Sequence, residues 1–342
     1  MGSQIIKMAA FEEFEKKFLS ATKDSFETLA LELFELQFQY NPLYQAFCSQ
    51  LSKTPDQVKC LKEIPFLPIG LFKQYAIKTT DFEAEQIFES SGTGGMIPSR
   101  HHVKKAGIYE QSFLAGFKQS YGNPEQWCIL GLLPSYLERG QSSLVYMTEQ
   151  LIQLSGHERS GFYLHDHAAL SNVISKNEAE AVATLLIGVT YALIDFSERY
   201  SMPLKNTILM ETGGMKGRRK ELLWQEVHAI LQERFHLQQI HSEYGMTELL
   251  SQAYSAANGL FKTADTLRIL IRSEDNPLEV ISADQISQPK RGGVNVIDLA
   301  NIYSCAFIAT DDAGLLYPDG SFEITGRLDS SEARGCSMMV AE

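Results

Sequence analysis

The feature that most constrains the fold is an alternation, between residues 76 and 261, of short apolar runs with longer amphipathic segments. A short apolar run between turn residues is typical of a buried strand, and apolar residues at three- and four-residue spacing are typical of a helix. Strands that alternate with helices need crossover connections, which produce a mostly parallel sheet. The predicted strands are residues 86–89, 127–133, 161–164, 184–190, 207–210 and 238–242, and the predicted helices are 103–120, 142–154, 168–176, 191–200 and 216–234.

The segments before and after this α/β core have different patterns of apolar residues. Residues 1–75 are predicted to form a helical N-terminal segment packed on the main domain, ending in an extended connection, EIPFLPIGLFK, that contains two prolines. After residue 262 the apolar runs follow one another closely, which predicts a smaller antiparallel β subdomain up to residue 329. Residues 330–342 are predicted to be a mobile tail. The strands expected in the β subdomain are residues 267–272, 278–282, 294–299, 305–310 and 322–325.

The composition excludes several classes of function. A net charge of −12 disfavours nucleic acid and anionic membrane surfaces as partners. No apolar run reaches the roughly 18 residues of a membrane-spanning helix, and the N-terminus becomes acidic too soon for a signal peptide. The five cysteines are widely spaced and include no CxxC pair, which disfavours disulfides and zinc ribbons. We therefore expect a cytoplasmic protein with reduced thiols and no stable membrane insertion.

Residues 89–100, ESSGTGGMIPSR, gather small, hydroxylated and glycine residues directly after a predicted strand. Backbone amides in such a loop can approach a phosphate closely. Neither common phosphate-loop pattern fits, because no lysine completes GxxxxGK[ST] and Ile97 replaces the third glycine of GxGxxG. His101 and His102 follow the loop and are further candidates to face phosphates or a substrate carboxylate. Taken alone, the segment is also consistent with an ordinary glycine-rich turn.

Two more polar segments follow predicted strands. METGGMKGRRKE, residues 210–221, places two glycines at a strand end, where ligands bind in α/β sheets. HSEYGMTE, residues 241–248, supplies an aromatic ring, a hydroxyl and a carboxylate. These suit a planar base, a phosphate and Mg²⁺, through Tyr244, Thr247 and Glu248. Either segment alone is equally consistent with a strand-to-helix turn.

The last such segment is ATDDAGLLYPDGSFEITGRLD, residues 309–329. Its Pro-Asp-Gly sequence predicts a hairpin turn at residues 318–320. An aspartate before the turn can accept hydrogen bonds from ribose hydroxyls, and Arg327 can help to position the same sugar or a phosphate. A solvated acidic hairpin is the alternative for this segment in isolation.

In this order and spacing, SSGTGG, GG, YGMTE and TDD…GRLD resemble the motifs of the adenylate-forming superfamily, over residues 85–330. That superfamily includes acyl-CoA ligases, peptide-synthetase adenylation domains and firefly luciferase. The chain looks most like the acyl-protein synthetases of bacterial bioluminescence operons (LuxE type), which share the helical N-terminus, an IPFLP-type segment and a terminal GR…RGC. The resemblance implies an α/β adenylate-forming large domain, with parallel sheets flanked by helices and a small β subdomain, but without the mobile C-terminal domain.

The resemblance also implies a reaction and a set of site residues. ATP and Mg²⁺ would convert a carboxylic acid, in this subgroup a long-chain fatty acid, to an acyl-AMP. The loop that wraps the β- and γ-phosphates corresponds to Ser90, Ser91, Gly92, Thr93, Gly94 and Gly95. The residues that border adenine correspond to Gly213, Gly214, Tyr244 and Gly245. The α-phosphate contact, the Mg²⁺ ligand, the ribose-binding carboxylate and its arginine partner correspond, in that order, to Thr247, Glu248, Asp312 and Arg327.

The chain departs from the superfamily pattern in two places. Arg100 is the first cation after the glycine-rich loop, where a lysine is usual, and the sequence stops at Glu342, before the domain that carries the catalytic lysine of typical members. Cys336 matches the cysteine that carries the acyl group as a thioester in LuxE-type proteins, and Arg334 nearby favours its thiolate. This implies an acid–thiol ligase with a partner protein that accepts or donates the acyl group. A free cysteine in a frayed tail is the alternative.

Two other functions stay open from the sequence. An acyl- or aryl-CoA ligase would release AMP in a CoA-dependent reaction that persists in Cys336→Ala. A non-catalytic nucleotide- or acyl-binding subunit, supporting a partner enzyme, would bind ATP without forming an adenylate.

Overall fold

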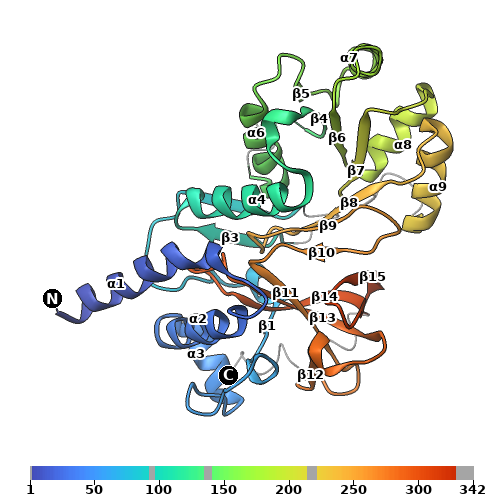
Figure 1. Ribbon diagram of the computed structural model, residues 1–342. Helices are drawn as coiled ribbons and strands as arrows, with labels where there is room; N and C mark the ends of the chain where they lie inside the picture. The colour runs from blue at the N-terminus through green and yellow to red at the C-terminus, as the bar shows by residue number, and fades with distance from the viewer. Residues whose placement is uncertain (1, 92–96, 135–140, 214–221, 329–342) are drawn as a thin grey trace.

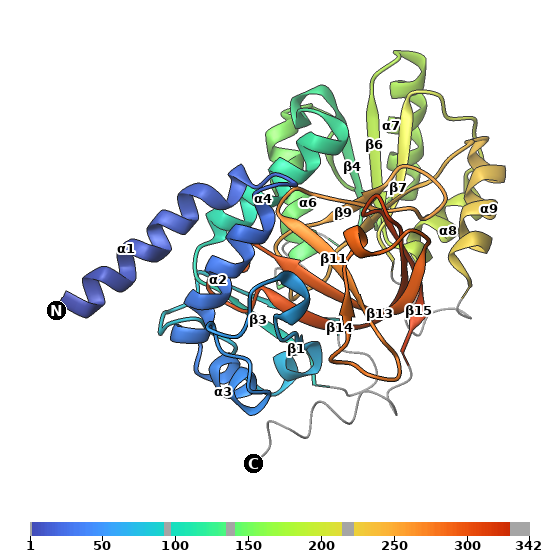
Figure 2. The same cartoon turned by 60° about the horizontal axis from the view of Figure 1, so that its bottom comes forward.

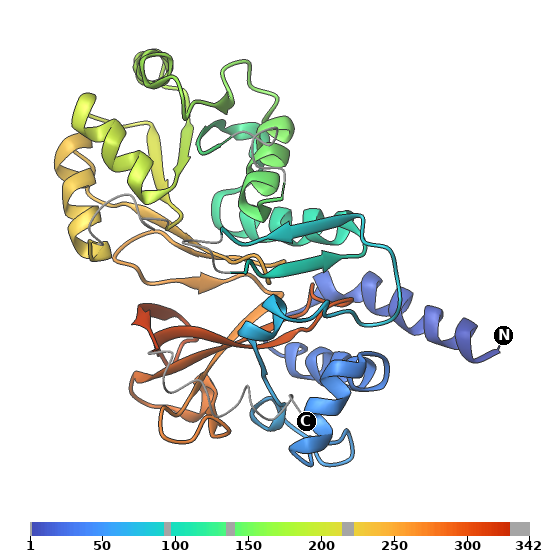
Figure 3. The same cartoon turned by 180° about the vertical axis from the view of Figure 1, so that it is seen from behind.

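The computed structural model describes residues 2–91, 97–134, 141–213 and 222–328 (Figure 1). Within these residues, two large β-sheets lie next to each other, and helices cover their outer sides. A two-stranded hairpin lies between the sheets and is best seen from behind (Figure 3). The predicted α/β class is therefore confirmed. No helix in the described part of the chain is both long enough and apolar enough to cross a membrane.

The first sheet has seven strands in the order β10-β9-β8-β7-β6-β4-β5. Strands β5, β4, β6, β7 and β8 are mutually parallel, and β9 and β10 add to the sheet antiparallel. Its strands are β4 (Cys128–Leu132), β5 (Gly161–Phe162), β6 (Thr184–Gly188), β7 (Thr207–Glu211), β8 (His241–Tyr244), β9 (Ala253–Ser255) and β10 (Lys262–Thr263). The helices between and before them are α4 (Ala106–Tyr121), α6 (Ser143–Ser155), α7 (His167–Ala179), α8 (Thr190–Arg199) and α9 (Trp224–Phe235).

The apolar runs of this sheet are continuous because helices cover both of its faces. Cys128, Leu130 and Leu132 of β4 point into one buried cluster together with residues of α7, α8 and α9. The alternate residue Ile129 and Leu133 belong to the other large cluster, on the side of α4 and α6. A strand buried on both faces carries apolar residues without polar alternation, and the sequence pattern of residues 127–133 reflects this.

Two sequence predictions in this region need correction. The strand at residues 86–89 exists as β2 (Gln86–Glu89), but it pairs antiparallel with β3 (Arg100–Val103) instead of joining the parallel sheet. The connection is the loop 90–99, which is too short for a crossover and reverses the chain. The strand expected at 238–242 is shifted, since HSEY itself forms β8. Its burial alternates, so it lacks the apolar run that predicted the strand upstream.

The second sheet has the order β1-β14-β13-β11-β12, with β15 paired to β14. The chain reverses between β14 and β15 at the predicted Pro-Asp-Gly turn, where Tyr317 N donates to Ser321 O at 2.9 Å. All the pairings are antiparallel except that of β1, which comes from the proline-rich connection and runs parallel to β14. The strands are β1 (Leu67–Pro68), β11 (Leu267–Arg272), β12 (Val280–Ile281), β13 (Lys290–Asp298), β14 (Phe307–Leu316) and β15 (Phe322–Arg327).

The N-terminal helices pack against the second sheet (Figure 2). The rings of Phe34 and Tyr44 contact Phe307 of β14. Buried Gln37 donates to Asn301 O at 2.7 Å and accepts from Ala306 N at 2.9 Å, which satisfies backbone groups of the turn between β13 and β14. The helices are α1 (Gly2–Lys17), α2 (Phe26–Tyr40) and α3 (Pro42–Gln50), and short 3₁₀ helices cover Phe18–Ser20, Leu61–Glu63, Ile69–Lys73, Pro124–Gln126 and Ala283–Gln285.

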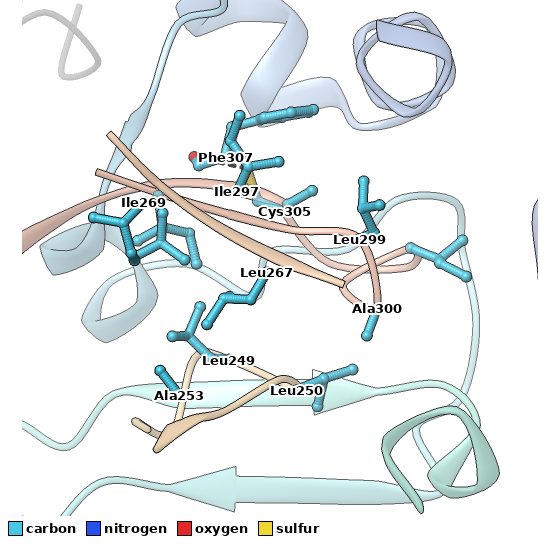
Figure 4. Packing of buried hydrophobic residues seen from close by; sticks show 14 of the residues in the cluster. Leu249, Leu250, Ala253, Leu267, Ile269, Ile297, Leu299, Ala300, Cys305 and Phe307 are labelled. Carbon is cyan, nitrogen blue, oxygen red and sulfur yellow. Dashed lines mark hydrogen bonds between the residues drawn. The ribbon is translucent and has the colours of Figure 1, made fainter. Parts of the chain in front are cut away.

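The two sheets share one apolar core. Leu249, Leu250 and Ala253, which lie between β8 and β9 or within β9, face Leu267 and its neighbours from the second sheet (Figure 4). Both sheets are therefore held at a fixed distance at the carboxyl end of β8, where the polar motifs lie.

Candidate functional site

A cavity of about 640 Å³ opens where the carboxyl ends of β7 and β8 meet strands β14 and β15 of the second sheet. Segments that lie far apart in the sequence form its wall, from residue 69 to residue 327. Nine of the site residues predicted from the sequence line this single cavity, namely Ser90, Ser91, Gly213, Tyr244, Gly245, Thr247, Glu248, Asp312 and Arg327. The other predicted residues, Gly92, Thr93, Gly94, Gly95, Gly214 and Cys336, lie outside the described residues.

Tyr244, Asp312 and Arg327 form a connected polar group on one wall of the cavity. The Tyr244 hydroxyl donates to Asp312 Oδ2 at 2.9 Å, and Arg327 Nε lies 3.5 Å from Asp312 Oδ1. Strand register produces this pairing, because Asp312 and Arg327 are direct neighbours across β14 and β15. Burial raises the pKa of Asp312, and the guanidinium of Arg327 opposes that rise. An ionised carboxylate held in this way can accept hydrogen bonds from a diol such as ribose.

Thr247 and Glu248 follow β8 and lie at the junction of the two sheets. The Glu248 side chain is 5% exposed, and burial raises its pKa, while a hydrogen bond from Ser99 and the charge of Lys73 oppose that rise. The described residues contain no cluster of three or more metal-ligating side chains. A single carboxylate nevertheless fits Mg²⁺, which commonly keeps several waters and binds through one or two carboxylates plus substrate phosphates.

The turn after β7 is shaped by Gly213 and Glu211. Gly213 has a φ of +73°, a left-handed conformation that favours glycine, and a Cβ there would meet open space. Its N–H donates to Glu211 Oε1 at 2.7 Å, and the Thr190 hydroxyl donates to the same oxygen. The carboxylate therefore fixes the turn and leaves the glycine free to face a flat ligand.

The base of the glycine-rich loop is closed by hydrogen bonds between Ser90 and Ser99. Ser90 N donates to Ser99 O at 3.1 Å, and Ser99 N donates to Ser90 Oγ at 2.9 Å. Arg100, the first cation after the loop, pairs with Glu89 at 2.9 Å across the β2–β3 ladder. This ion pair holds the two ends of the loop together next to the cavity.

The sequence made His101 a candidate to face phosphates or a substrate carboxylate, but the structure does not place it on the cavity wall. Its ring is fully buried, and its Nδ1 lies 2.9 Å from Thr247 O. Burial lowers the pKa of His101 to about 4, so the ring is neutral at physiological pH. His101 does not line the cavity. Its contact with Thr247 O instead holds the backbone of Thr247 in place. The alternation of β3 turns one histidine inward, and the sequence alone does not say which one.

Asp298 and Asn301 are positioning residues that sequence reasoning missed. Both are fully buried at the end of β13 in the second sheet. The Asp298 carboxylate accepts from Leu250 N at 2.7 Å and from Ser251 N at 3.0 Å, and Asn301 Nδ2 donates to Glu248 O at 2.8 Å. The second sheet thus holds the backbone that presents Glu248. These contacts join residues about fifty positions apart, and no local pattern predicts them.

Replacing Asp298 with alanine is expected to lower the free energy of unfolding by about 3 kcal/mol or more, because several buried N–H donors lose their acceptor at once. Chemical denaturation monitored by circular dichroism measures this loss. Asp275→Ala, on an exposed loop, serves as the matched control. A change of less than 1 kcal/mol in Asp298→Ala would show that the network does not hold the two sheets together.

Lys73 is a second residue that the sequence analysis did not select. It ends the 3₁₀ helix Ile69–Lys73, lines the cavity, and contributes a positive charge that lowers the pKa of Glu248. It brings a second cation to the cavity, from outside the four motifs, in addition to Arg327 of the fourth motif. The signal available in the sequence was its place at the end of EIPFLPIGLFK, the connection with two prolines that supplies β1.

Comparison with known proteins bears on the fold. No protein-family model and no curated protein matches the chain significantly. Among solved structures, the ATP-bound RpMatB-BxBclM chimeras B3 and B1 align with TM-scores of 0.50, at 14% and 15% sequence identity. ATP-bound MatB from Rhodopseudomonas palustris aligns at 15% identity, with a TM-score of 0.49. Each alignment covers 70% of this chain and 47% of the other.

The chain therefore shares the fold of the aligned part of the two chimeras. The aligned part spans about half the length of those chains. At this level of identity the likeness concerns the fold, and the chemistry of the site rests on the chain's own residues.

Proposed function

We propose that this protein activates a carboxylic acid with ATP, forming an acyl-adenylate and pyrophosphate, and then transfers the acyl group to a thiol. One observation carries the proposal. Residues from all four motifs that resemble the adenylate-forming pattern line one cavity, at the edge where an α/β sheet binds ligands. If the four motifs resembled the pattern only by chance, there would be no reason for all of them to line the same cavity.

The proposed roles come from the resemblance, and the geometry of the cavity is compatible with them. The left-handed turn at Gly213 and the ring of Tyr244 border adenine, and Asp312 with Arg327 holds the ribose. Ser90 and Ser91, at the base of the glycine-rich loop, lie near the phosphates. Glu248 would hold Mg²⁺, which supplies charge neutralisation on the phosphates when bound.

The chemistry is a displacement followed by an acyl transfer. A carboxylate oxygen of the acid attacks the α-phosphorus of ATP, and the bond to pyrophosphate breaks. The site contributes position and electrostatic stabilisation, with Thr247 next to the α-phosphate. A thiolate then attacks the acyl carbon of the adenylate, AMP leaves, and a thioester forms.

The acid and the acceptor come from the resemblance to LuxE-type acyl-protein synthetases. It points to a long-chain fatty acid and to Cys336 as the acceptor thiol, with a partner protein that receives or supplies the acyl group. We place the reaction in the cytoplasm, where such a thiol stays reduced. Coenzyme A is the alternative acceptor, and a non-catalytic nucleotide-binding subunit is the alternative without chemistry.

Two measurements test the proposal together. ATP–pyrophosphate exchange with a panel of acids reports adenylate formation, and intact-protein mass spectrometry after incubation with ATP, Mg²⁺ and the same acids reports acyl transfer. We expect exchange with at least one acid and an acyl adduct on the protein. ATP binding without exchange, across fatty, aryl, amino and hydroxy acids, would favour the non-catalytic subunit. CoA-dependent AMP release without an adduct would favour the ligase.

Lys73→Ala is expected to raise the KM for ATP about tenfold, since a positive charge close to the phosphates is lost; a tenfold change corresponds to about 1.4 kcal/mol. The melting temperature should stay within a few degrees of wild type, because Lys73 is exposed. Lys118→Ala, on the exposed side of α4, is the matched control. An unchanged KM for ATP would remove Lys73 from the proposed phosphate site.

A further inference from the structure

One end of the cavity is lined by residues that have no part in the proposed nucleotide site. Tyr109 of α4, Met147 of α6 and Leu133 at the end of β4 give it an apolar wall. Two polar side chains, Glu243 and Gln252, interrupt this wall. An apolar pocket with a few placed polar groups is the usual form of a small-molecule site, in which the polar groups decide the orientation of the ligand.

Glu243 has a carboxyl group without a donor. No hydrogen bond to it is found within the described part of the chain, and it lies close to Gly245, where a Cβ would come within 2.3 Å of Glu243 Oε1. The missing side chain at Gly245 therefore makes room for this carboxyl group. Burial, together with the charge of Glu211, raises the pKa of Glu243 to about 8.

Gln252 is the second polar group without a partner. Its side chain is 3% exposed, and its Oε1 makes no hydrogen bond among the described residues. Its Cγ lies 3.6 Å from a Cβ built on Gly245, so Glu243 and Gln252 flank the same glycine. A buried acceptor without a donor costs stability, and such a cost is commonly retained where a ligand supplies the missing donor.

Glu211 provides an internal contrast. Its Oε1 accepts hydrogen bonds from Thr190 and from Gly213 N, so its carboxylate serves the turn after β7. Glu243 lies on the neighbouring strand β8, and the charge of Glu211 raises its pKa. Unlike Glu211, it accepts no hydrogen bond from a turn in the described part of the chain. The two carboxyl groups therefore differ in role although both are half-buried.

We propose that Glu243 and Gln252 bind a hydrogen-bond donor, an ammonium or hydroxyl group, carried by the acid that the protein activates. This inference rests on the proposed function and names its substrate class. An unsubstituted alkyl chain would leave both acceptors buried without donors, whereas an amino or hydroxy acid satisfies them. A fatty acid fits this pocket only where it carries such a substituent.

The test compares matched acids in ATP–pyrophosphate exchange. Amino, hydroxy and unsubstituted acids of equal chain length are assayed with wild type, Glu243→Gln, Gln252→Leu and the surface control Glu233→Gln. We expect wild type to prefer a donor-bearing acid by about 100-fold or more, because a site with buried acceptors rejects analogues that lack the donor. Each site variant should lose at least about tenfold of that preference without a change in the KM for ATP. If Glu243→Gln loses the preference for the amino acid but keeps that for the hydroxy acid, the group bound by Glu243 is an ammonium.

The outcomes separate this inference from the proposed function. Wild type that activates the unsubstituted acid as well as its substituted partner overturns the inference and leaves adenylation standing. If no acid supports exchange, calorimetric titration of the same acids decides, and binding that does not depend on Glu243 and Gln252 overturns the inference. Both variants should melt no lower than wild type, since Gln252→Leu removes a buried, unpaired acceptor and Glu243→Gln removes an unpaired carboxyl group. A drop of several degrees in both would instead assign the two residues a structural role.

Discussion

Glu248→Gln is expected to lower the rate of ATP–pyrophosphate exchange by about 10²–10³, the range typical for the loss of one group that stabilises a charged transition state. The amide keeps the shape of the carboxylate and removes its charge, so the Mg²⁺ that would bind the phosphates loses its anionic protein ligand. Initial rates at saturating ATP, measured over a range of Mg²⁺ concentrations, check this result. Raising Mg²⁺ should restore only part of the lost rate.

The folded state should survive this substitution. Burial raises the pKa of Glu248, so its contribution to stability is complete below the unfolded pKa and is lost as the pH rises through the folded pKa. Glutamine does not ionise, and Glu248→Gln should therefore be at least as stable as wild type at neutral pH. Glu233→Gln, exposed on α9, controls for preparation. Exchange within threefold of wild type would remove Glu248 from the site.

The sequence pointed to those cavity-lining residues that lie within short local motifs. YGMTE begins at the end of the parallel strand β8, as a motif at a strand end of an α/β sheet predicts. TDD was expected to follow a strand but lies within the antiparallel strand β14, and GR ends its neighbour β15. What the sequence did not predict depends on contacts between distant segments. Asp298 holds the backbone of Leu250 across the two sheets, and Lys73 reaches the cavity from the N-terminal segment.

The fold shows the same difference between features that a local pattern predicts and features that depend on distant segments. The strands of the parallel sheet could be predicted because burial on both faces leaves an apolar run, as in β4 and β6. The two-residue strand β1 carries no such run, and its partner β14 lies some 240 positions later in the chain. Likewise, β2 has the composition of a sheet strand, and only the short loop that follows it dictates a hairpin. Partner choice between distant strands is set by packing, which a local pattern does not contain.

Glu243 illustrates how a motif can hide a residue. It stands inside HSEYGMTE, and its neighbours Tyr244 and Glu248 resemble known positions, so it did not stand out in the sequence. Side-chain alternation along β8 places it on the opposite face from Tyr244. Its place on the cavity wall, together with the absence of a donor among the described residues, is what distinguishes it.

Cys336→Ser is expected to abolish the hydroxylamine-sensitive acyl adduct that forms with ATP and acid, while ATP–pyrophosphate exchange stays within about threefold of wild type, roughly 0.6 kcal/mol. A thioester is cleaved readily because a thiol leaves far better than an alkoxide, so any ester on serine should form slowly and resist hydroxylamine. Intact-protein mass spectrometry with and without hydroxylamine measures the adduct, and peptide mapping locates it.

The other cysteines make this prediction specific. Cys48, Cys128 and Cys305 are buried, and burial raises the pKa of each thiol, that of Cys305 to about 12, so few thiolates form there at neutral pH. Cys60 is partly exposed and is the one competitor among the described cysteines, which makes Cys60→Ser the matched control. We expect Cys60→Ser to keep the adduct and Cys336→Ser to lose it. An adduct that maps to Cys60, or that persists in Cys336→Ser with unchanged sensitivity to hydroxylamine, would reject Cys336 as the acceptor and leave adenylation itself untouched.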